Sequence, residues 1–168
     1  VPARDFCDGC DSAWLDLSKG LGAPVGGVLA GSAAFIAEAR RYKHIFGGAM
    51  RQAGIIAAAG VYALEHHVAR LADDHENARR LAAGLGDIPG VTVENPEPDT
   101  NIVFFDIAGT GTEPPAFLAA IQARGVRMGA MGPRRLRAVT HPDIGATDIE
   151  TAIGVVRDVL TVGRAGGT

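Results

Sequence analysis

The sequence predicts a mixed protein, between α/β and α+β in class, with a buried core. Hydrophobic residues make up 47% of its 168 residues and charged residues 21%, which is the balance of an ordinary globular chain. Short apolar runs bounded by glycine and proline alternate with longer stretches whose apolar residues recur with a period near 3.6. Strands and helices that follow one another in this way are typical of α/β and α+β architectures.

Composition and charge exclude several classes of protein. The net charge of -3 leaves no dominant basic face, which argues against a nucleic-acid partner. No run approaches the roughly 20 apolar residues of a membrane helix, so no membrane partner is expected. Cys7 and Cys10 form a single C-x-x-C pair, which offers too few ligands for a structural zinc site. We therefore expect two free thiols and a reducing, cytoplasmic setting.

The first half of the chain predicts two short strands and a series of helices. Residues 12–17 form an apolar run suited to a buried strand, and residues 25–30 form a second one. Ser32 is a candidate N-cap for a helix that Gly47-Gly48 stops. Residues 50–85 have a helical pattern, but the stretch is too long for one ordinary globular helix. We expect a break near residues 66–69.

Four short strands are predicted in the second half. Residues 91–93 and 101–107 are rich in valine and phenylalanine, with alternation in the second run. Residues 126–130 and 136–140 are typical of a strand pair around Gly132-Pro133.

Two helices are predicted beside these strands. Pro114-Pro115 opens a helix through Ala123, since proline suits a first helical turn. Thr147 and Glu150 form a capping box at the start of the last helix. An apolar stripe then marks its buried side: Ile149, Ala152, Ile153, Val156 and Leu160.

The segment most informative about chemistry is residues 11–26, where Lys19 follows an apolar strand and precedes small residues. We expect such a lysine to be desolvated, which makes its neutral amine available. A neutral amine can attack an aldehyde and form a Schiff base, and the nearby glycines leave space for a flat ring. From the residues alone, a loop lysine with a packed stem is the more common alternative.

Three motifs give the chain a family resemblance. Residues 17–26, Leu-Ser-Lys-Gly-Leu-Gly-Ala-Pro-Val-Gly, resemble the cofactor-lysine segment of L-threonine aldolases. Residues 47–54, Gly-Gly-Ala-Met-Arg-Gln-Ala-Gly, resemble the Gly-Gly-Gly-Met-Arg-Gln motif of that family. Residues 137–143, Arg-Ala-Val-Thr-His-Pro-Asp, resemble its Arg-x-Val-Thr-His-x-Asp segment. With Asn-Ala-Arg at 77–79 and Thr-Asn-Ile-Val at 100–103 between them, the resemblance covers nearly the whole chain.

The resemblance implies the C-terminal half of a low-specificity threonine aldolase, which is a pyridoxal 5'-phosphate (PLP) enzyme with the aspartate-aminotransferase-like fold, fold type I. It implies that residues 1–48 are a remnant of the large PLP-binding α/β domain and that residues 49–68 form a connecting helix. Residues 69–162 would then be the small C-terminal α+β domain, and residues 163–168 are expected to be a flexible tail.

The resemblance also implies site residues. Lys19 would form the Schiff base with PLP, and L-threonine or L-allo-threonine would be cleaved to glycine and an aldehyde. Arg137 would hold the substrate carboxylate, and its alternative is a surface ion pair. Arg51 would lie near the cofactor phosphate of a neighbouring subunit in a homodimer or homotetramer, and its alternative is a surface charge at a helix start. No metal is expected.

Some features depart from the family pattern. Ala49 replaces a glycine of the Gly-Gly-Gly run, and His44 stands where many relatives have a lysine near the phosphate. Lys43 is adjacent, but neighbouring helical residues point about 100° apart. Only eighteen residues, beginning without Met, precede Lys19. The family's pyridine-nitrogen carboxylate, stacking ring and phosphate-binding turn lie upstream, so we expect a piece of a longer protein that alone binds cofactor weakly and catalyses poorly.

Two other functions stay open at this point. The chain could belong to another enzyme of the same fold, a β-eliminating lyase or an aminotransferase. It could also be a non-catalytic domain that pairs with another subunit through the helical stretch 50–85.

Overall fold

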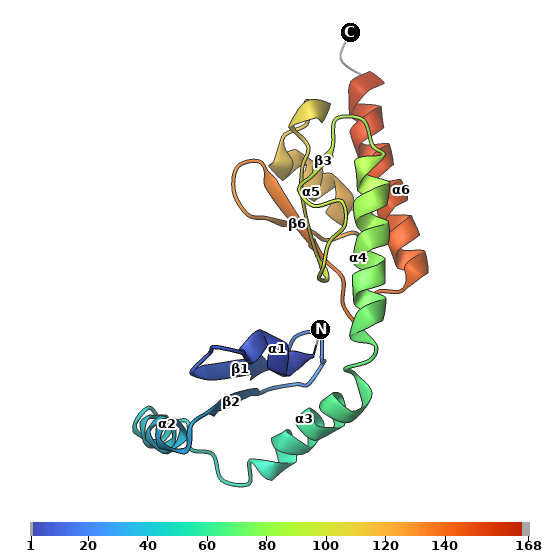
Figure 1. Ribbon diagram of the computed structural model, residues 1–168. Helices are drawn as coiled ribbons and strands as arrows, with labels where there is room; N and C mark the ends of the chain where they lie inside the picture. Colours follow the sequence, from blue (N-terminus) through green and yellow to red (C-terminus); the bar gives the residue numbers. More distant parts are fainter. Residues whose placement is uncertain (1, 166–168) are drawn as a thin grey trace. The chain divides into compact units, whose positions relative to one another are not determined.

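The computed structural model describes residues 2–165, with side chains through residue 161. Their contacts divide the chain into two compact units, with the boundary between Arg70 and Leu71. We call them the N-terminal unit and the C-terminal unit, and Figure 1 shows their elements. Within the described residues, no helix is long and apolar enough to cross a membrane.

The N-terminal unit consists of a two-stranded hairpin and three helices. The strands pair antiparallel, with Ser12 opposite Gly31 and Asp16 opposite Gly27. Its elements in chain order are α1 (Ala3–Cys7), β1 (Ser12–Asp16), β2 (Gly27–Gly31), α2 (Ala33–Ile45) and α3 (Gly54–His66).

Local signals explain where its helices begin and end. The Ser32 side chain accepts a hydrogen bond from the backbone N–H of Phe35 at 3.2 Å, so the predicted N-cap of α2 is confirmed. Gly47, at φ 75°, follows the end of that helix. The predicted break after α3 is also confirmed, because residues 67–70 separate it from α4. The helix α1 has no counterpart in the sequence prediction.

No residue of the hairpin strands is fully buried, which corrects the prediction of a buried strand over residues 12–17 at every position except Leu17. Trp14 is 67% exposed, and every residue of β2 is exposed. The helices of the N-terminal unit leave much of the hairpin uncovered. Its apolar side chains, which the strand pattern predicted to lie in a core, therefore remain accessible in this chain.

The C-terminal unit has a four-stranded antiparallel sheet in the order β3-β4-β6-β5. Three helices pack on one face of this sheet, and α4 and α6 run side by side (Figure 1). Its elements are α4 (Leu71–Gly86), β3 (Thr92–Val93), β4 (Ile102–Asp106), η1 (Ala108–Thr110), α5 (Pro114–Gln122), β5 (Gly129–Ala130), β6 (Arg135–Val139) and α6 (Ala146–Ala165).

Alternation along the two central strands defines the core. Val103 and Phe105 of β4 face Ala138 and Leu136 of β6 on the covered side, and all four are buried. The stripe predicted on α6 packs into the same core, where Ile149, Ile153, Val156 and Leu160 are buried. The other side of the sheet carries charged residues such as Arg135 and Arg137 beside the apolar Ile102, Phe104 and Val139, and the side chains there are partly or fully exposed.

Two details at the ends of α6 differ from the sequence prediction. The capping contact comes from Asp148, whose Oδ2 accepts from the backbone N–H of Gly145 at 2.8 Å, and not from Thr147 with Glu150. Gly145 directly precedes the helix, so the capping residues lie two positions upstream of those predicted. The helix continues to Ala165, within the predicted flexible tail 163–168, whose last three residues lie outside the described part of the chain.

Candidate functional site

Lys19 lies in a tightly hydrogen-bonded turn between β1 and β2. The backbone N–H of Gly22 donates to the carbonyl of Lys19 at 2.9 Å, and Gly22 has φ 70°. The N–H of Ala23 donates to the carbonyl of Leu17 at 2.9 Å, and the N–H of Leu17 donates to that of Gly26 at 3.0 Å. Glycine adopts a positive φ without strain, which explains why this position of the motif is a glycine.

The Lys19 side chain is exposed in this chain, which corrects the expected desolvation. Its side chain is 78% exposed, and Nζ lies 3.8 Å from Oδ2 of Asp16. Among the described residues, the contact with Asp16 is the one ion pair or hydrogen bond of the Lys19 amine, and much of the surrounding hairpin is exposed. The amine is therefore accessible, with a carboxylate close enough to attract it electrostatically.

The turn is anchored to α3 by packing. Leu17, Leu21 and Ala23 are all buried, although most of the surrounding hairpin is exposed. A Cβ added to Gly60 of α3 would lie 2.8 Å from Cδ1 of Leu17. The Leu17 side chain therefore packs directly on the backbone of α3 at Gly60, and a side chain at position 60 would require the end of Leu17 to shift.

A hydrogen bond from the end of α3 also reaches the turn. His67, the C-cap of α3, places Nδ1 2.6 Å from the carbonyl oxygen of Leu21. The His67 ring is half-buried and meets Tyr62 edge-on, with centroids 5.6 Å apart. No local sequence pattern indicates this contact, because the partner lies 46 residues away.

Arg51 lies in a sharp turn just before α3. It is exposed, and among the described side chains it has no ion-pair partner. The next residue, Gln52, has φ 53°, and it is the one described non-glycine residue with a positive φ. Such conformations are uncommon and concentrate at functional sites, which makes the Met-Arg-Gln turn a candidate site on structural grounds.

An apolar groove of about 330 Å³ lies between the hairpin and α3. Lys43 is its charged lining residue, while His44 turns back to its own helix and places Nδ1 2.7 Å from the Arg40 carbonyl. Lys43, and not His44, is thus the basic residue of α2 that faces a cavity, in a volume range that ligand sites use. The groove is lined by Leu17, Val25, Gly26, Gly27, Val28, Lys43, Ala53, Ile56, Ala57, Gly60, Val61 and Leu64.

Arg137 lies on the open face of the C-terminal sheet. It is exposed on β6, opposite Phe104 of β4 and Gly129 of β5. Among the described residues no ion pair with Arg137 is found, so the surface ion pair considered from sequence does not form. Its guanidinium is free to bind an anion from outside this unit.

Arg135, two residues earlier on the same face, differs from Arg137 because it has an ion-pair partner. It donates to both carboxylate oxygens of Glu94, from Nε at 2.7 Å and from Nη2 at 2.8 Å. Its guanidinium also stacks 3.7 Å from the centroid of the Phe104 ring. The hydrogen bonds from Arg135 lower the pKa of Glu94, and the same contact raises the pKa of Arg135.

Several other motif residues form a polar cluster that holds the end of β6. The buried hydroxyl of Thr140 donates to the carbonyl of Asp74 at 2.6 Å, and Nδ2 of Asn101 donates to the carbonyl of Thr140 at 2.6 Å. Nδ2 of Asn77 donates to the carbonyl of Ile144 at 3.0 Å. These residues join α4, β4 and β6 within the C-terminal unit, and their role is to position the strand that carries Arg137.

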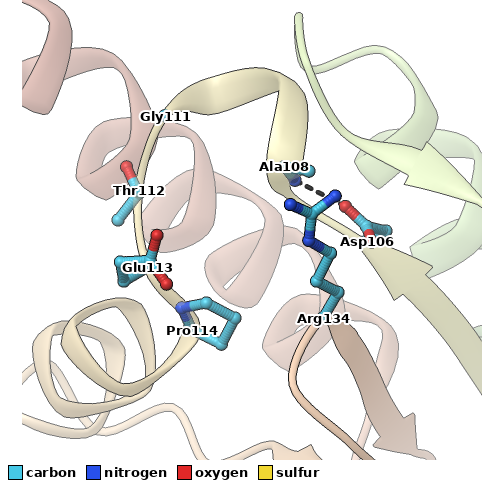
Figure 2. Close-up of a pocket in the computed structure, with 7 residues that line it drawn as sticks. All are labelled: Asp106, Ala108, Gly111, Thr112, Glu113, Pro114 and Arg134. Carbon is cyan, nitrogen blue, oxygen red and sulfur yellow. Dashed lines mark hydrogen bonds between the residues drawn. The ribbon is translucent and has the colours of Figure 1, made fainter.

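A small cavity at the end of β4, shown in Figure 2, contains none of the predicted site residues. Oδ1 of Asp106 accepts from the backbone N–H of Ala108 at 2.5 Å, and Glu113 and Arg134 line the opposite walls. Its volume is about 90 Å³, well below the 300 Å³ or so of a typical ligand site. We therefore do not regard it as a cofactor site.

The three predicted site residues are divided between the two units. Lys19 and Arg51 belong to the N-terminal unit, and Arg137 belongs to the C-terminal unit. Among the described residues no group of three or more His, Cys, Asp and Glu could hold a metal ion, and both cysteines are free and exposed.

Comparisons with known proteins identify a family and several relatives. A family model described as beta-eliminating lyase matches residues 1–109. The chain is 40% identical over 165 residues to a protein of Arabidopsis thaliana named probable low-specificity L-threonine aldolase 2, covering 95% of this chain and 45% of that protein. It is 43% identical over 142 residues to the low specificity L-threonine aldolase of Escherichia coli K12, covering 84% of this chain and 40% of that enzyme.

A solved structure shows the same fold. The crystal structure of a proposed L-allo-threonine aldolase from Listeria monocytogenes EGD-E superposes with a TM-score of 0.75 at 23% identity, covering 95% of this chain and 47% of that one. The chain thus spans less than half the length of these relatives.

Proposed function

Because the chain belongs to the beta-eliminating lyase family, we propose that the native protein is a PLP-dependent aldehyde-lyase of the threonine aldolase type. It would cleave L-threonine or L-allo-threonine to glycine and an aldehyde. The observation on which this proposal depends most is the turn at Lys19, where an accessible primary amine is held on a backbone that buried side chains and hydrogen bonds fix in place.

The residues present fit one part of a PLP site. Covalent attachment needs a primary amine that an aldehyde can reach, and the exposed Lys19 side chain meets this need, with Asp16 3.8 Å from Nζ. Ser18 and Gly20 on either side of it are small, so they leave space for a flat ring. When bound, PLP would act as the electron sink for cleavage of the Cα–Cβ bond. Lys19 would hold the cofactor, and its amine is the group that an amino-acid substrate must displace.

Arg137 is proposed as the carboxylate-binding residue. Its planar guanidinium can bind both oxygens of a carboxylate, and no ion pair within the described residues competes for it. Arg135 cannot easily share this role, because Glu94 already occupies its guanidinium. The face therefore offers one free guanidinium for one substrate carboxylate.

Arg51 is proposed to lie near the cofactor phosphate, in a site shared between subunits. The uncommon backbone of Gln52 supports this placement, because it sets the direction of the turn that presents Arg51. A homodimer or homotetramer and a cytoplasmic location belong to the same proposal. The two relatives named as low-specificity L-threonine aldolases support its substrate class.

Substitution of Lys19 in the native protein tests this function. Lys19→Ala removes the amine, and Lys19→Arg keeps a positive charge beside Asp16 but offers no reactive primary amine. We expect both variants to lose at least about a thousandfold in glycine release from L-threonine, since the covalent route depends on this group. Arg137→Lys should keep glycine release but raise KM by about tenfold or more, as expected for a weakened charged hydrogen bond.

Product analysis separates this proposal from its alternatives. Glycine with an aldehyde supports it, whereas ammonia with a keto acid would indicate β-elimination and transfer of the amino group would indicate an aminotransferase. Glycine release at the wild-type rate by Lys19→Arg would contradict the proposed role of Lys19, whereas no release of glycine, ammonia or a keto acid by the wild-type native protein would favour the non-catalytic function.

A further inference from the structure

We propose that His67 is a positioning residue for Lys19, which it holds in place through a hydrogen bond from the imidazole to the carbonyl of Leu21. The inference rests on the proposed role of Lys19 as the residue that carries the cofactor. His67 itself lies at the C-cap of α3 and is not placed against the reacting atoms, so its effect is exerted through the backbone of the turn.

The direction of this hydrogen bond is determined by its acceptor. A carbonyl oxygen can only accept, so Nδ1 of His67 must carry the proton and donate to Leu21 across 2.6 Å. The neutral ring then leaves its lone pair on Nε2. Since the protonated ring also has a proton on Nδ1, this donor is present in both charge states.

The ring is held in the orientation that this hydrogen bond requires. It is half-buried, it meets Tyr62 edge-on at 5.6 Å, and Nδ1 lies 3.7 Å from the position of a Cβ on Gly22. The backbone of Gly22 thus lies directly beside the imidazole, and a Cβ there would be in ordinary van der Waals contact with it. The neighbouring His66 is exposed, and its ring packs on Tyr62 with centroids 4.2 Å apart.

The hydrogen bond reaches Lys19 through a short and connected stretch of backbone. Leu21 is two residues from Lys19, and the next N–H, that of Gly22, donates back to the Lys19 carbonyl. The other hydrogen bonds within this turn are local to the hairpin, whereas His67 is 46 residues away from its acceptor. Loss of the donor would leave the Leu21 carbonyl without this partner and free the part of the turn that follows Lys19.

Limited digestion with an endoproteinase specific for lysine can test this without cofactor. The sequence contains just two lysines, Lys19 and Lys43, so the two cleavage sites provide an internal ratio. His67→Phe keeps a ring but removes the donor. His67→Asn places an amide N–H near the position of Nδ1, and His66→Phe is the matched control at the neighbouring residue.

We expect His67→Phe to raise cleavage at Lys19 relative to Lys43 about fivefold, which is roughly what loss of one net hydrogen bond does to a local opening equilibrium. His67→Asn and His66→Phe should remain within about twofold of wild type. An unchanged ratio in His67→Phe, an equal increase at both lysines, or no rescue by asparagine would each overturn the proposal, because the effect would then be absent, global or independent of the donor.

Nitrogen-15 NMR of the imidazole provides a measurement that needs no variant to fold. The proposal requires the proton of the neutral His67 ring on Nδ1, and a proton on Nε2 alone would overturn it. Both measurements use the 168-residue chain without PLP. A failure of the activity test on Lys19 would therefore refute the proposed function, whereas a failure of these two measurements would refute the hydrogen-bond role of His67 alone, so the two failures can be told apart.

Discussion

Arg135 and Arg137 lie two residues apart on β6, and both point to the open face of the sheet. Glu94 and the Phe104 ring hold the first, while the second has no ion pair among the described residues. Two free guanidinium groups this close would repel one another and could both bind anions. Pairing of Arg135 with Glu94 reduces that repulsion and leaves a single site for a carboxylate.

The Glu94–Arg135 pair should make stability depend on pH in a defined direction. The hydrogen bonds from Arg135 lower the pKa of Glu94 below its ordinary value of 4.5. The pair therefore stabilises the folded chain above that ordinary value, and the contribution is lost as the pH falls through the lower folded pKa. Urea unfolding of wild type and Glu94→Gln should show wild type more stable at neutral pH and the two equal in strong acid.

Salt and a neighbouring carboxyl serve as controls for this prediction. The pair is exposed, so about 1 M salt should reduce the difference between the two proteins. Glu97→Gln, on the adjoining loop and without an ion pair among the described residues, should show little difference at any pH. A gap between wild type and Glu94→Gln that persists unchanged at low pH would contradict the account.

The sequence alone could locate some of these residues but not their environments. The motifs around Lys19 and Arg137 predict their positions, and alternation along Arg135-Leu136-Arg137 could have placed both arginines on one face. The exposure of Lys19 was predicted wrongly, because an apolar strand pattern indicates burial without stating which chain segment covers it. The contact of His67 with Leu21 depends on tertiary structure and leaves no local signal.

Among the secondary-structure elements, α4 and α6 pack at a close crossing on Gly84. A Cβ at this position would lie 2.8 Å from Cγ1 of Ile153 and would meet its Cδ1 even more closely. Gly154, on α6, has no atom within 4 Å of the corresponding position. The two glycines therefore have opposite roles, although both lie inside helices.

This difference predicts opposite effects of alanine at the two positions. Gly84→Ala should destabilise the chain by about 1–3 kcal/mol, because overpacking exceeds the gain in helix propensity. Gly154→Ala should stabilise it by up to about 1 kcal/mol. Thermal or urea unfolding measures both changes, and a stabilising Gly84→Ala would show that the two helices do not pack as described.

The boundaries of helices and strands were predicted best where a single residue type, by its own local chemistry, begins or ends the element. Ser32 as N-cap, the break at residues 67–70 and the start of α5 at Pro114 are confirmed. The start of α6 was placed wrongly, because Gly145-Ala146-Thr147-Asp148 offers a competing cap through Asp148 that leaves Thr147 inside the helix. The helix α1 was missed since its five residues are too few for a periodic pattern.

At the scale of the whole molecule, the two units differ in how far each completes its own core. The C-terminal unit buries a continuous apolar cluster between its sheet and its helices. The N-terminal unit leaves large apolar side chains exposed, including Phe46 at 82% and Ile55 at 77%.

The fold-type I class predicted from the motifs is confirmed by solved structures of the same fold. The chain spans 45% of the Arabidopsis thaliana relative and 40% of the Escherichia coli relative. The site residues, the oligomer and the compartment stay predictions.

The most direct test of the account is to trap the cofactor on its lysine. The native protein is incubated with PLP and reduced with borohydride, and the modified lysine is identified by mass spectrometry. We expect the phosphopyridoxyl group on Lys19 and little or none on Lys43, the other lysine of this chain. Modification of Lys43 in preference to Lys19, or equal modification of both, would contradict the claim that Lys19 carries the cofactor.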